Sequence, residues 1–202
     1  MHFVRAGRGA PALVNHLELA RCVLVGHSMG CRVVLEAARL MPEKVAGLVL
    51  VDGSRNATRD PEGAEAAARA TVEKLGYAPF AEMLFRQMFF KPSTQADAIV
   101  ARALKTSAEF GPVLWPRITR WDAGQMDAAF DALRAPVLAI QSTTRNAELK
   151  RAPLKAGDTS PWIDYLRSRG AKVEIVPDTG HFTQLEAPET VNRLIDEFLK
   201  TI

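Results

Sequence analysis

The sequence predicts an α/β fold, in which a parallel sheet of about four strands carries an inserted block of helices. Short apolar runs rich in branched residues recur along the chain, and their length is typical of strands buried on both faces. Segments of helical composition separate these runs, as in the strand–helix–strand units of parallel sheets. Between residues 53 and 134 the strand pattern is absent, and Ala-rich, helix-favouring sequence replaces it.

The part of the chain before the insertion predicts a strand–helix–strand unit. An amphipathic helix is expected over residues 12–19, followed by a buried strand over residues 22–26. Residues 31–40 have helical composition and stop before Pro42, which cannot continue a helix. Residues 45–51 form a second apolar run. Because the helix serves as a crossover, we expect the two strands to be parallel neighbours in one sheet.

The inserted segment predicts helices that are punctuated by proline residues. The expected helices cover residues 62–75, 80–90, 96–110 and 125–133. The segment also holds most of the aromatic side chains, including Phe80, Phe85, Phe89, Phe90, Phe110, Trp115 and Trp121. These side chains either pack the inserted helices against one another or, as a group, cover an apolar pocket.

The strand pattern returns after the insertion. Ser160 and Pro161 predict a helix start, because a hydroxyl cap stands directly before a proline in the first helical position. The expected elements are a strand over residues 136–140, a polar loop over 141–157, a helix over 161–168, a strand over 172–176 and an amphipathic helix over 188–201.

Composition excludes several classes of protein. The 202 residues carry a net charge of +3, and the positive residues are scattered, without the basic face and interleaved aromatics of a nucleic-acid binder. No apolar run approaches the roughly 18 residues of a membrane span, and the first residues do not form a signal peptide. We therefore expect a cytoplasmic protein that contacts neither nucleic acid nor a membrane.

One motif carries nucleophile chemistry. Gly26-His27-Ser28-Met29-Gly30 matches the pattern G-x-S-x-G, with an apolar strand before it and a helix after it. In such a tight turn the flanking positions are expected to lack side chains, and the serine projects above the sheet edge in a strained conformation. The helix start then points free N–H groups at a developing negative charge. The alternative is a glycine-rich turn without catalysis.

A nucleophilic serine needs a base, and His181 is the best placed histidine. It lies in the loop over residues 178–182, directly after the last predicted strand. Because the carboxyl ends of parallel strands share one sheet edge, His181 and Ser28 are expected to meet there. The alternative is a histidine that only stabilises its loop. The other three histidines lie in the N-terminal segment, in a predicted helix and within the motif: His2, His16 and His27.

Together these motifs resemble the α/β-hydrolase family with a helical cap. The matching segments are the serine motif, the insertion, the strand start at 135–138, the histidine loop at 179–182 and the helix start at 186–189. The resemblance implies that Ser28 is the nucleophile, that His181 is its base and that the Met29 N–H is one oxyanion donor. It also makes the predicted sheet equivalent to strands 5–8 of the family's fold.

The acid that would orient His181 departs from the commoner family pattern. That pattern has an aspartate a few residues beyond the seventh strand, whereas residues 141–147 contain no carboxylate. Asp52 ends the predicted strand over 45–51, and a subset of the family places its acid there. We therefore expect Asp52 to complete the triad; the alternatives are Asp158 and Glu148, and Asp52 could instead be only a strand-end turn residue.

The equivalents of strands 1–4 are absent from the predicted elements, and residues 1–11 do not resemble a replacement. The loop that gives the family its second oxyanion N–H belongs to that part of the fold. The strand over residues 22–26 would then be an apolar sheet edge without a blocking residue. We expect this edge to pair with another chain, as in a homodimer.

The resemblance implies a serine hydrolase without metal or organic cofactor, with its core in residues 1–52 and 135–202 and its cap in residues 53–134. The expected small-molecule substrate is a small, apolar carboxylic ester, and a carbon–carbon bond in a diketone-like acid is the alternative within the family. Two alternatives to this activity remain. The chain could be a catalytically weak or inactive fragment of a hydrolase, or a protein that binds an apolar ligand under the cap.

Overall fold

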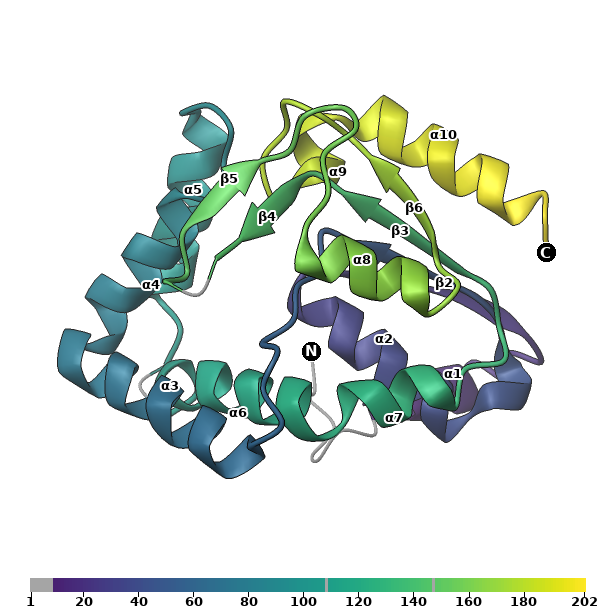
Figure 1. The fold of residues 1–202 in the computed structure, drawn as a ribbon, viewed down its shortest axis with the longest axis horizontal. Helices are drawn as coiled ribbons and strands as arrows, with labels where there is room; N and C mark the ends of the chain where they lie inside the picture. The colour runs from purple at the N-terminus through teal and green to yellow at the C-terminus, as the bar shows by residue number, and fades with distance from the viewer. Residues whose placement is uncertain (1–8, 108, 147) are drawn as a thin grey trace.

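The computed structural model describes residues 9–107, 109–146 and 148–202, and its main feature is a parallel sheet (Figure 1). The sheet has the strand order β1-β2-β3-β6, and each neighbouring pair is parallel. These strands are β1 (Cys22–His27), β2 (Val45–Val51), β3 (Val137–Gln141) and β6 (Lys172–Ile175). The predicted α/β class and four-stranded parallel sheet are therefore confirmed.

Helices cover both faces of the sheet, so the core has three layers. The helices that flank it are α1 (Gly9–His16), α2 (Met29–Leu40), α8 (Pro161–Ser168), α9 (Thr183–Glu186) and α10 (Pro188–Leu199), and a 3-10 turn covers Pro42–Lys44. Side chains of β2 alternate between two apolar clusters: Leu48 and Leu50 pack with α2 and α8, whereas Val49 and Val51 pack with α10. Strand β2 is thus buried on both faces, as its continuous apolar sequence predicts.

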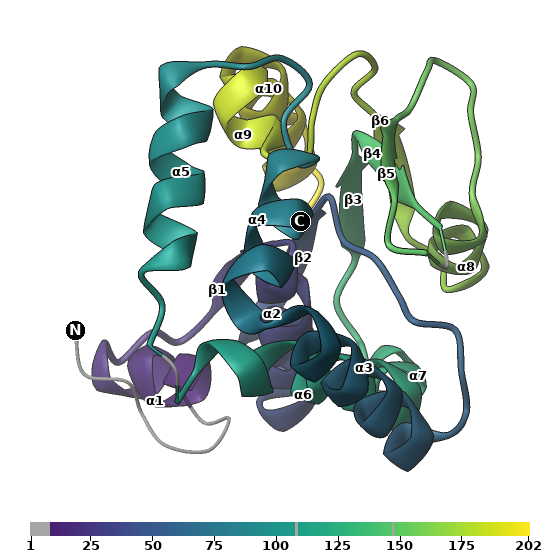
Figure 2. The ribbon, with the colours of Figure 1, turned by 90° about the vertical axis from the view of Figure 1, so that its left-hand side faces the viewer.

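The chain between β2 and β3 folds into helices. They are α3 (Pro61–Leu75), α4 (Tyr77–Arg86), α5 (Thr94–Leu104), α6 (Gly111–Gly124) and α7 (Met126–Asp131). Figure 2 shows α4 and α5 standing beside the sheet, with α3 and α6 below them. Helix α7 differs from its neighbours, because its Met126 and Phe130 join the core cluster beneath the sheet. The domain boundaries at 53 and 134 stay a prediction.

Helix α6 corrects the expectation that proline interrupts this region. Pro112 lies in the first turn, where its missing N–H removes no intrahelical hydrogen bond. Pro116 lies inside the helix and is buried, and it removes one hydrogen bond from the ladder. The helix continues because it packs along α3, with Thr119 Oγ1 donating to the carbonyl oxygen of Ala64 at 3.1 Å. Tertiary packing therefore overrides the local signal of the two prolines.

The predicted polar loop over 141–157 is also wrong in part, because it contains a short hairpin. Strands β4 (Thr143–Arg145) and β5 (Arg151–Pro153) pair antiparallel, and Arg145 and Arg151 are direct partners in the register. The hairpin was not predicted because its sequence is polar and lacks the apolar alternation of a half-buried strand. The hairpin brings both arginines to the candidate site described below.

Strand β1 forms one edge of the sheet in the part of the chain that the structure describes. Its Val25 is 52% exposed, although valine is usually buried. The predicted pairing of this edge with another chain stays a prediction. The expectation that residues 1–11 hold no replacement strand concerns mostly residues 1–8, which lie outside the described residues. No helix among the described residues is long and apolar enough to cross a membrane.

Candidate active site

The turn between β1 and α2 holds Ser28 in a strained backbone conformation. Ser28 has φ 56° and ψ −115°, a region that residues other than glycine rarely adopt. Its backbone N–H donates to the carbonyl oxygen of Val51 at 2.9 Å, which fixes the turn to the end of β2. A Cβ atom on Gly26 would lie 2.4 Å from the carbonyl oxygen of Gly30. The first glycine of the motif is therefore required by close backbone approach.

The second glycine does not behave as predicted. A Cβ atom on Gly30 would meet no atom within 4 Å, so its lack of a side chain is not needed for the turn. Met29 is the first residue of α2, and its N–H therefore has no partner inside the helix. This N–H follows Ser28 directly, and its role as an oxyanion donor stays a prediction.

Asp52 and His181 lie in direct contact, although they are far apart in the sequence. His181 Nδ1 donates to Asp52 Oδ2 at 2.6 Å, and both side chains are almost completely buried. Asp52 follows β2, where its φ of 43° turns the chain away from the sheet. The His181 loop is held in place by the His181 N–H, which donates to the carbonyl oxygen of Met88 at 2.6 Å.

The Asp52 carboxylate accepts hydrogen bonds from several groups besides His181. Oδ1 accepts from the N–H groups of Ser142 and Thr143 at 2.8 Å and from Gln141 Nε2 at 3.0 Å, and Oδ2 also accepts from Thr143 Oγ1 and, at 3.0 Å, from Arg151 Nη1. The residues after β3 thus serve as donors to Asp52 and supply no acid of their own. Sequence reasoning missed Thr143 and Arg151, which no local pattern connects with Asp52.

The alternative acids lie elsewhere. Asp158 accepts from the N–H of Lys155 in its own loop, and Glu148 is exposed. Neither forms an ion pair with a histidine of the described segments, whereas Asp52 does. Among the three candidate carboxylates, Asp52 is the one that the fold brings to His181.

Ser28 and His181 share this edge of the sheet but do not form a hydrogen bond with each other. His181 Nε2 is buried and has no hydrogen-bond partner among the described residues. The ring of His27 lies 4.6 Å from the ring of His181, and its Nε2 donates to the His181 carbonyl oxygen at 2.8 Å. The side chain of His27 therefore supports the His181 loop, a contact that the sequence analysis did not anticipate.

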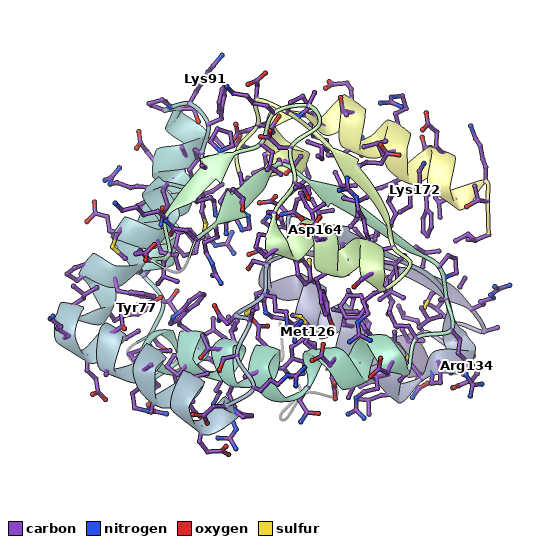
Figure 3. The ribbon with its side chains drawn as sticks, in the orientation of Figure 1. Tyr77, Lys91, Met126, Arg134, Asp164 and Lys172 are labelled. Carbon is purple, nitrogen blue, oxygen red and sulfur yellow. The ribbon has the colours of Figure 1, made fainter. Side chains whose placement is uncertain are left out.

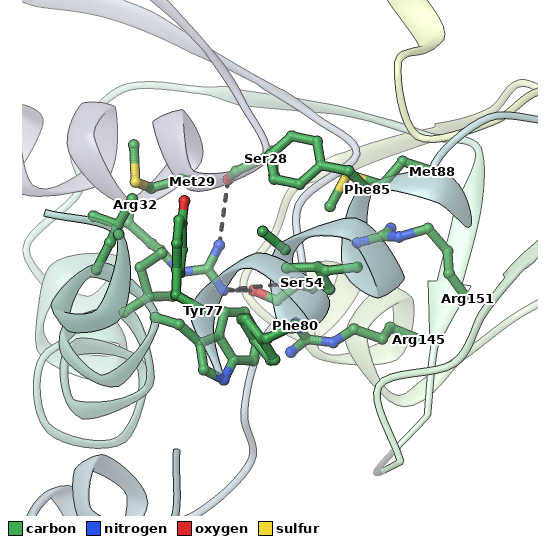
Figure 4. A pocket seen from close by; sticks show the side chains of 16 residues that line it. Ser28, Met29, Arg32, Ser54, Tyr77, Phe80, Phe85, Met88, Arg145 and Arg151 are labelled. Atoms are coloured by element: carbon green, nitrogen blue, oxygen red, sulfur yellow. Dashed lines mark hydrogen bonds between the residues drawn. The ribbon is translucent and has the colours of Figure 1, made fainter. Parts of the chain in front are cut away.

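A pocket of about 190 Å³ opens beside Ser28 (Figure 4). One wall is apolar and comes from α4 and α6, where the lining residues include Phe80, Leu84, Phe85, Trp115 and Ile118. Three of the seven aromatic residues singled out from the sequence, Phe80, Phe85 and Trp115, thus line this pocket. The lining also includes three arginine side chains: Arg32, Arg145 and Arg151.

A buried ion pair connects the helix after Ser28 with the inserted helices. Arg32 on α2 donates from Nε and Nη2 to the two carboxylate oxygens of Asp122 on α6, each at 2.7 Å. Such a bidentate ion pair fixes the relative orientation of the two side chains as well as their distance. Arg32 also donates to the carbonyl oxygen of Ser54 at 2.7 Å. The ion pair therefore holds α6, which lines the pocket, against the helix that begins directly after Ser28.

Burial lowers the pKa of His181 to about 4, since the hydrogen bond to Asp52 offsets only part of the desolvation and Arg151 opposes a second positive charge. The pKa of Asp52 is held below its usual range: burial alone would raise it, but the hydrogen bond from His181 and the charge of Arg151 outweigh that effect. At neutral pH the pair is therefore a carboxylate and a neutral imidazole whose Nε2 is available as a proton acceptor.

Replacing Arg151 with glutamine is expected to raise the pKa of His181, because the change removes a neighbouring positive charge and leaves Asp52 free to stabilise the imidazolium. In the unmodified protein His181 should stay neutral well below pH 6.5. An NMR titration of the imidazole resonances measures both values. The control is Arg134→Gln, which removes an equal charge from an exposed side chain. Equal titration of His181 in all three proteins would contradict the role of Arg151.

The fold and this edge of the sheet define an α/β protein with a serine at a strand-to-helix elbow and a histidine–carboxylate pair beside it. The sequence model of the alpha/beta hydrolase family matches residues 3–194, and the chain belongs to that family.

Solved structures with the same fold include several hydrolases. An esterase from Thermogutta terrifontis has a TM-score of 0.64 and 21% identity, over 96% of this chain and 71% of that one. A hydrolase from Pseudomonas aeruginosa has a TM-score of 0.72 and 19% identity, over 96% and 71%. A 2-hydroxy-6-oxo-6-phenylhexa-2,4-dienoate hydrolase from a Rhodococcus strain has a TM-score of 0.67 and 19% identity, over 96% and 69%.

A curated relative is similar in sequence to most of the chain. The dihydrolipoyllysine-residue acetyltransferase component of the acetoin cleaving system of Pseudomonas putida is 28% identical over 203 residues. The match covers 94% of this chain and 48% of that protein, so the chain spans about half the length of this relative.

Proposed function

We propose that this chain is a serine hydrolase that transfers the acyl group of a small carboxylic ester to water. The observation that carries the proposal is a strained Ser28 at the same sheet edge as a neutral His181, whose Nδ1 is held by Asp52 and whose Nε2 has no hydrogen-bond partner among the described residues. Membership of the alpha/beta hydrolase family and the esterases among its structural neighbours support it.

In the proposed mechanism Ser28 Oγ attacks the ester carbonyl while its proton moves to His181 Nε2. Asp52 stabilises the imidazolium that forms, and the Met29 N–H donates to the oxyanion. His181 then returns the proton to the departing alkoxide, which leaves Ser28 acylated. Water attacks the acyl-enzyme by the same route in reverse and releases the acid. No step uses a metal ion or an organic cofactor.

The lack of a hydrogen bond between Ser28 and His181 favours a second candidate, a protein that only binds a ligand in the pocket. Catalytic hydrogen bonds are often long until substrate is bound, so this geometry is also compatible with catalysis. Within the hydrolases, a carbon–carbon bond in a diketone-like acid is an alternative substrate, since one structural neighbour carries the name of a dienoate hydrolase.

Reaction with a fluorophosphonate probe separates these candidates, because only an activated serine becomes labelled. We expect labelling at Ser28, together with hydrolysis of p-nitrophenyl esters. Each added CH₂ of the acyl chain should lower KM by about 4-fold until the pocket is full, since burying a CH₂ contributes roughly 0.8 kcal/mol. A protein that binds such esters but is not labelled would be a binding protein. A flat dependence on chain length would show that the aromatic residues of α4 and α6 do not contact the substrate.

A further inference from the structure

Three guanidinium groups line the pocket beside Ser28, and two of them are neutralised by carboxylates. Arg32 is paired with Asp122 at 2.7 Å, and Arg151 is paired with Asp52 at 3.0 Å. The contacts of Arg145 are of another kind. Its Nη2 donates to Asn56 Oδ1 at 2.8 Å, and its Cζ lies 4.9 Å from the centre of the Trp115 ring. Within the described residues Arg145 therefore has no acidic partner.

The surroundings of Arg145 make an uncompensated charge costly. The pKa of Arg145 is lowered to about 10, chiefly by burial and also by the charges of Arg32 and Arg151, which outweigh the opposite effect of Asp122. The group still carries its positive charge at neutral pH. A second donor lies next to it, because Asn56 Nδ2 is buried and has no hydrogen-bond partner in the described part of the chain. An anion bound here would compensate the charge and accept hydrogen bonds from both side chains.

We propose that Arg145 and Asn56 form a subsite for the carboxylate of the substrate. Figure 4 shows Ser28 on one side of the pocket and Arg145 on the other, with Phe85 drawn near Ser28 and Phe80 near Arg145. The substrate class that follows is an apolar or aromatic ester with a carboxylate at the end remote from the scissile bond. That the substrate is an ester rests on the proposed function of Ser28, whereas the binding of a carboxylate at Arg145 does not.

The shape of the subsite favours a carboxylate on a flat, apolar group. A guanidinium is planar and presents parallel N–H groups that match the two oxygens of a carboxylate. The indole of Trp115 lies against Arg145 and extends the apolar wall up to the charge. The volume of about 190 Å³ is close to that of cavities of about 150 Å³ that hold one benzene molecule. A benzoate-sized acid is therefore a suitable probe.

The test measures the binding of benzoate and of benzamide, its uncharged isostere, to the full chain by calorimetry. We expect benzoate to bind about 10- to 100-fold more tightly, the range that corresponds to a buried hydrogen bond to a charged group. Arg145→Gln should abolish this preference while benzamide still binds, which shows that the pocket is intact. Arg134→Gln is the matched control, since Arg134 is exposed and lies at the opposite end of the molecule from the pocket residue Tyr77 (Figure 3).

A second variant keeps the arginine and blocks it. Asn56→Asp places a carboxylate at the atom that already contacts Arg145, so it should also abolish the preference for benzoate. The inference is overturned if the unmodified protein shows no saturable binding of benzoate, if it does not distinguish benzoate from benzamide, or if the preference survives in Arg145→Gln or in Asn56→Asp. Should Arg145→Gln fail to fold, the unmodified protein and Asn56→Asp still decide the question.

A kinetic comparison extends the test to an ester. 4-Acetoxybenzoate carries a carboxylate that cannot reach its own ester bond, and 4-acetoxybenzamide is its neutral counterpart. We expect kcat/KM to favour the acid by the same factor as in binding, and Arg145→Gln to remove the difference. Fluorophosphonate labelling of the same preparations tests the hydrolase function separately. Benzoate preference without labelling would refute the hydrolase and keep the subsite, whereas labelling without the preference would do the reverse.

Discussion

Replacing Ser28 with alanine is expected to reduce hydrolysis of p-nitrophenyl acetate by about 10⁴- to 10⁶-fold and to abolish fluorophosphonate labelling. The reason is that Ser28 would supply the atom that becomes acylated. His181→Ala should cause a loss of similar size, because the serine hydroxyl is a weak nucleophile without a base. The double variant should be no worse than either single variant, since the two groups act as one unit.

The folded state of these variants can be checked separately. The small Ser28 side chain neutralises no charged group and fills little space. Ser28→Ala should therefore unfold at nearly the same temperature as the unmodified protein. His181 is fully buried, and a thermal unfolding curve must therefore accompany His181→Ala. Activity that survives Ser28→Ala at close to the original level would refute the assignment of the nucleophile.

Asp52→Asn is expected to lower kcat by about 10⁴-fold, because an amide cannot stabilise the imidazolium and favours the wrong tautomer of His181. The same change should also destabilise the protein. It removes the acidic partner of the buried Arg151, and breaking a buried ion pair typically costs about 3–5 kcal/mol. Steady-state kinetics measures the first effect, and chemical denaturation measures the second.

Two control variants make the Asp52 experiment specific. Asp158→Asn and Glu148→Gln remove the same charge from the other candidate acids, neither of which forms an ion pair with His181. Both should retain kcat within about 2-fold, as is usual for surface changes of small effect. A large loss in either of them, with little loss in Asp52→Asn, would assign the acid to the region after β3. A lower kcat in Asp52→Asn counts only for protein that remains folded at the assay temperature.

Many of the strands and helices that position this site can be predicted from local sequence. The apolar run before Gly26 and the run that ends at Val51 predict β1 and β2 with nearly their observed bounds. Hydrophobic periodicity and turn chemistry are local properties, and short buried strands express both. The Ser160–Pro161 signal likewise predicts the start of α8, where Ser160 Oγ accepts from the Ile163 N–H at 3.3 Å.

The errors occur where long-range packing competes with local preference. Helix α6 runs through Pro116 because α3 and the buried Asp122 hold it in place. The hairpin of β4 and β5 forms in polar sequence because its strands pair with each other and its residues bind Asp52. The contacts of α6 with α3 and with Arg32, and those of the hairpin with Asp52, join residues that are distant along the chain, so no window of sequence contains them.

The sequence by itself determined the serine turn, the candidate histidine and the strands that bring their loops to one edge. It also narrowed the acid to three carboxylates. Only the tertiary structure decided that Asp52 contacts His181, that Arg151 shares the same carboxylate and that Arg145 faces the pocket with no acidic partner in the described part of the chain. The physical reason is that a charge acts through space: its effect depends on which partners reach it and how much water is excluded, and both are set by the folded chain.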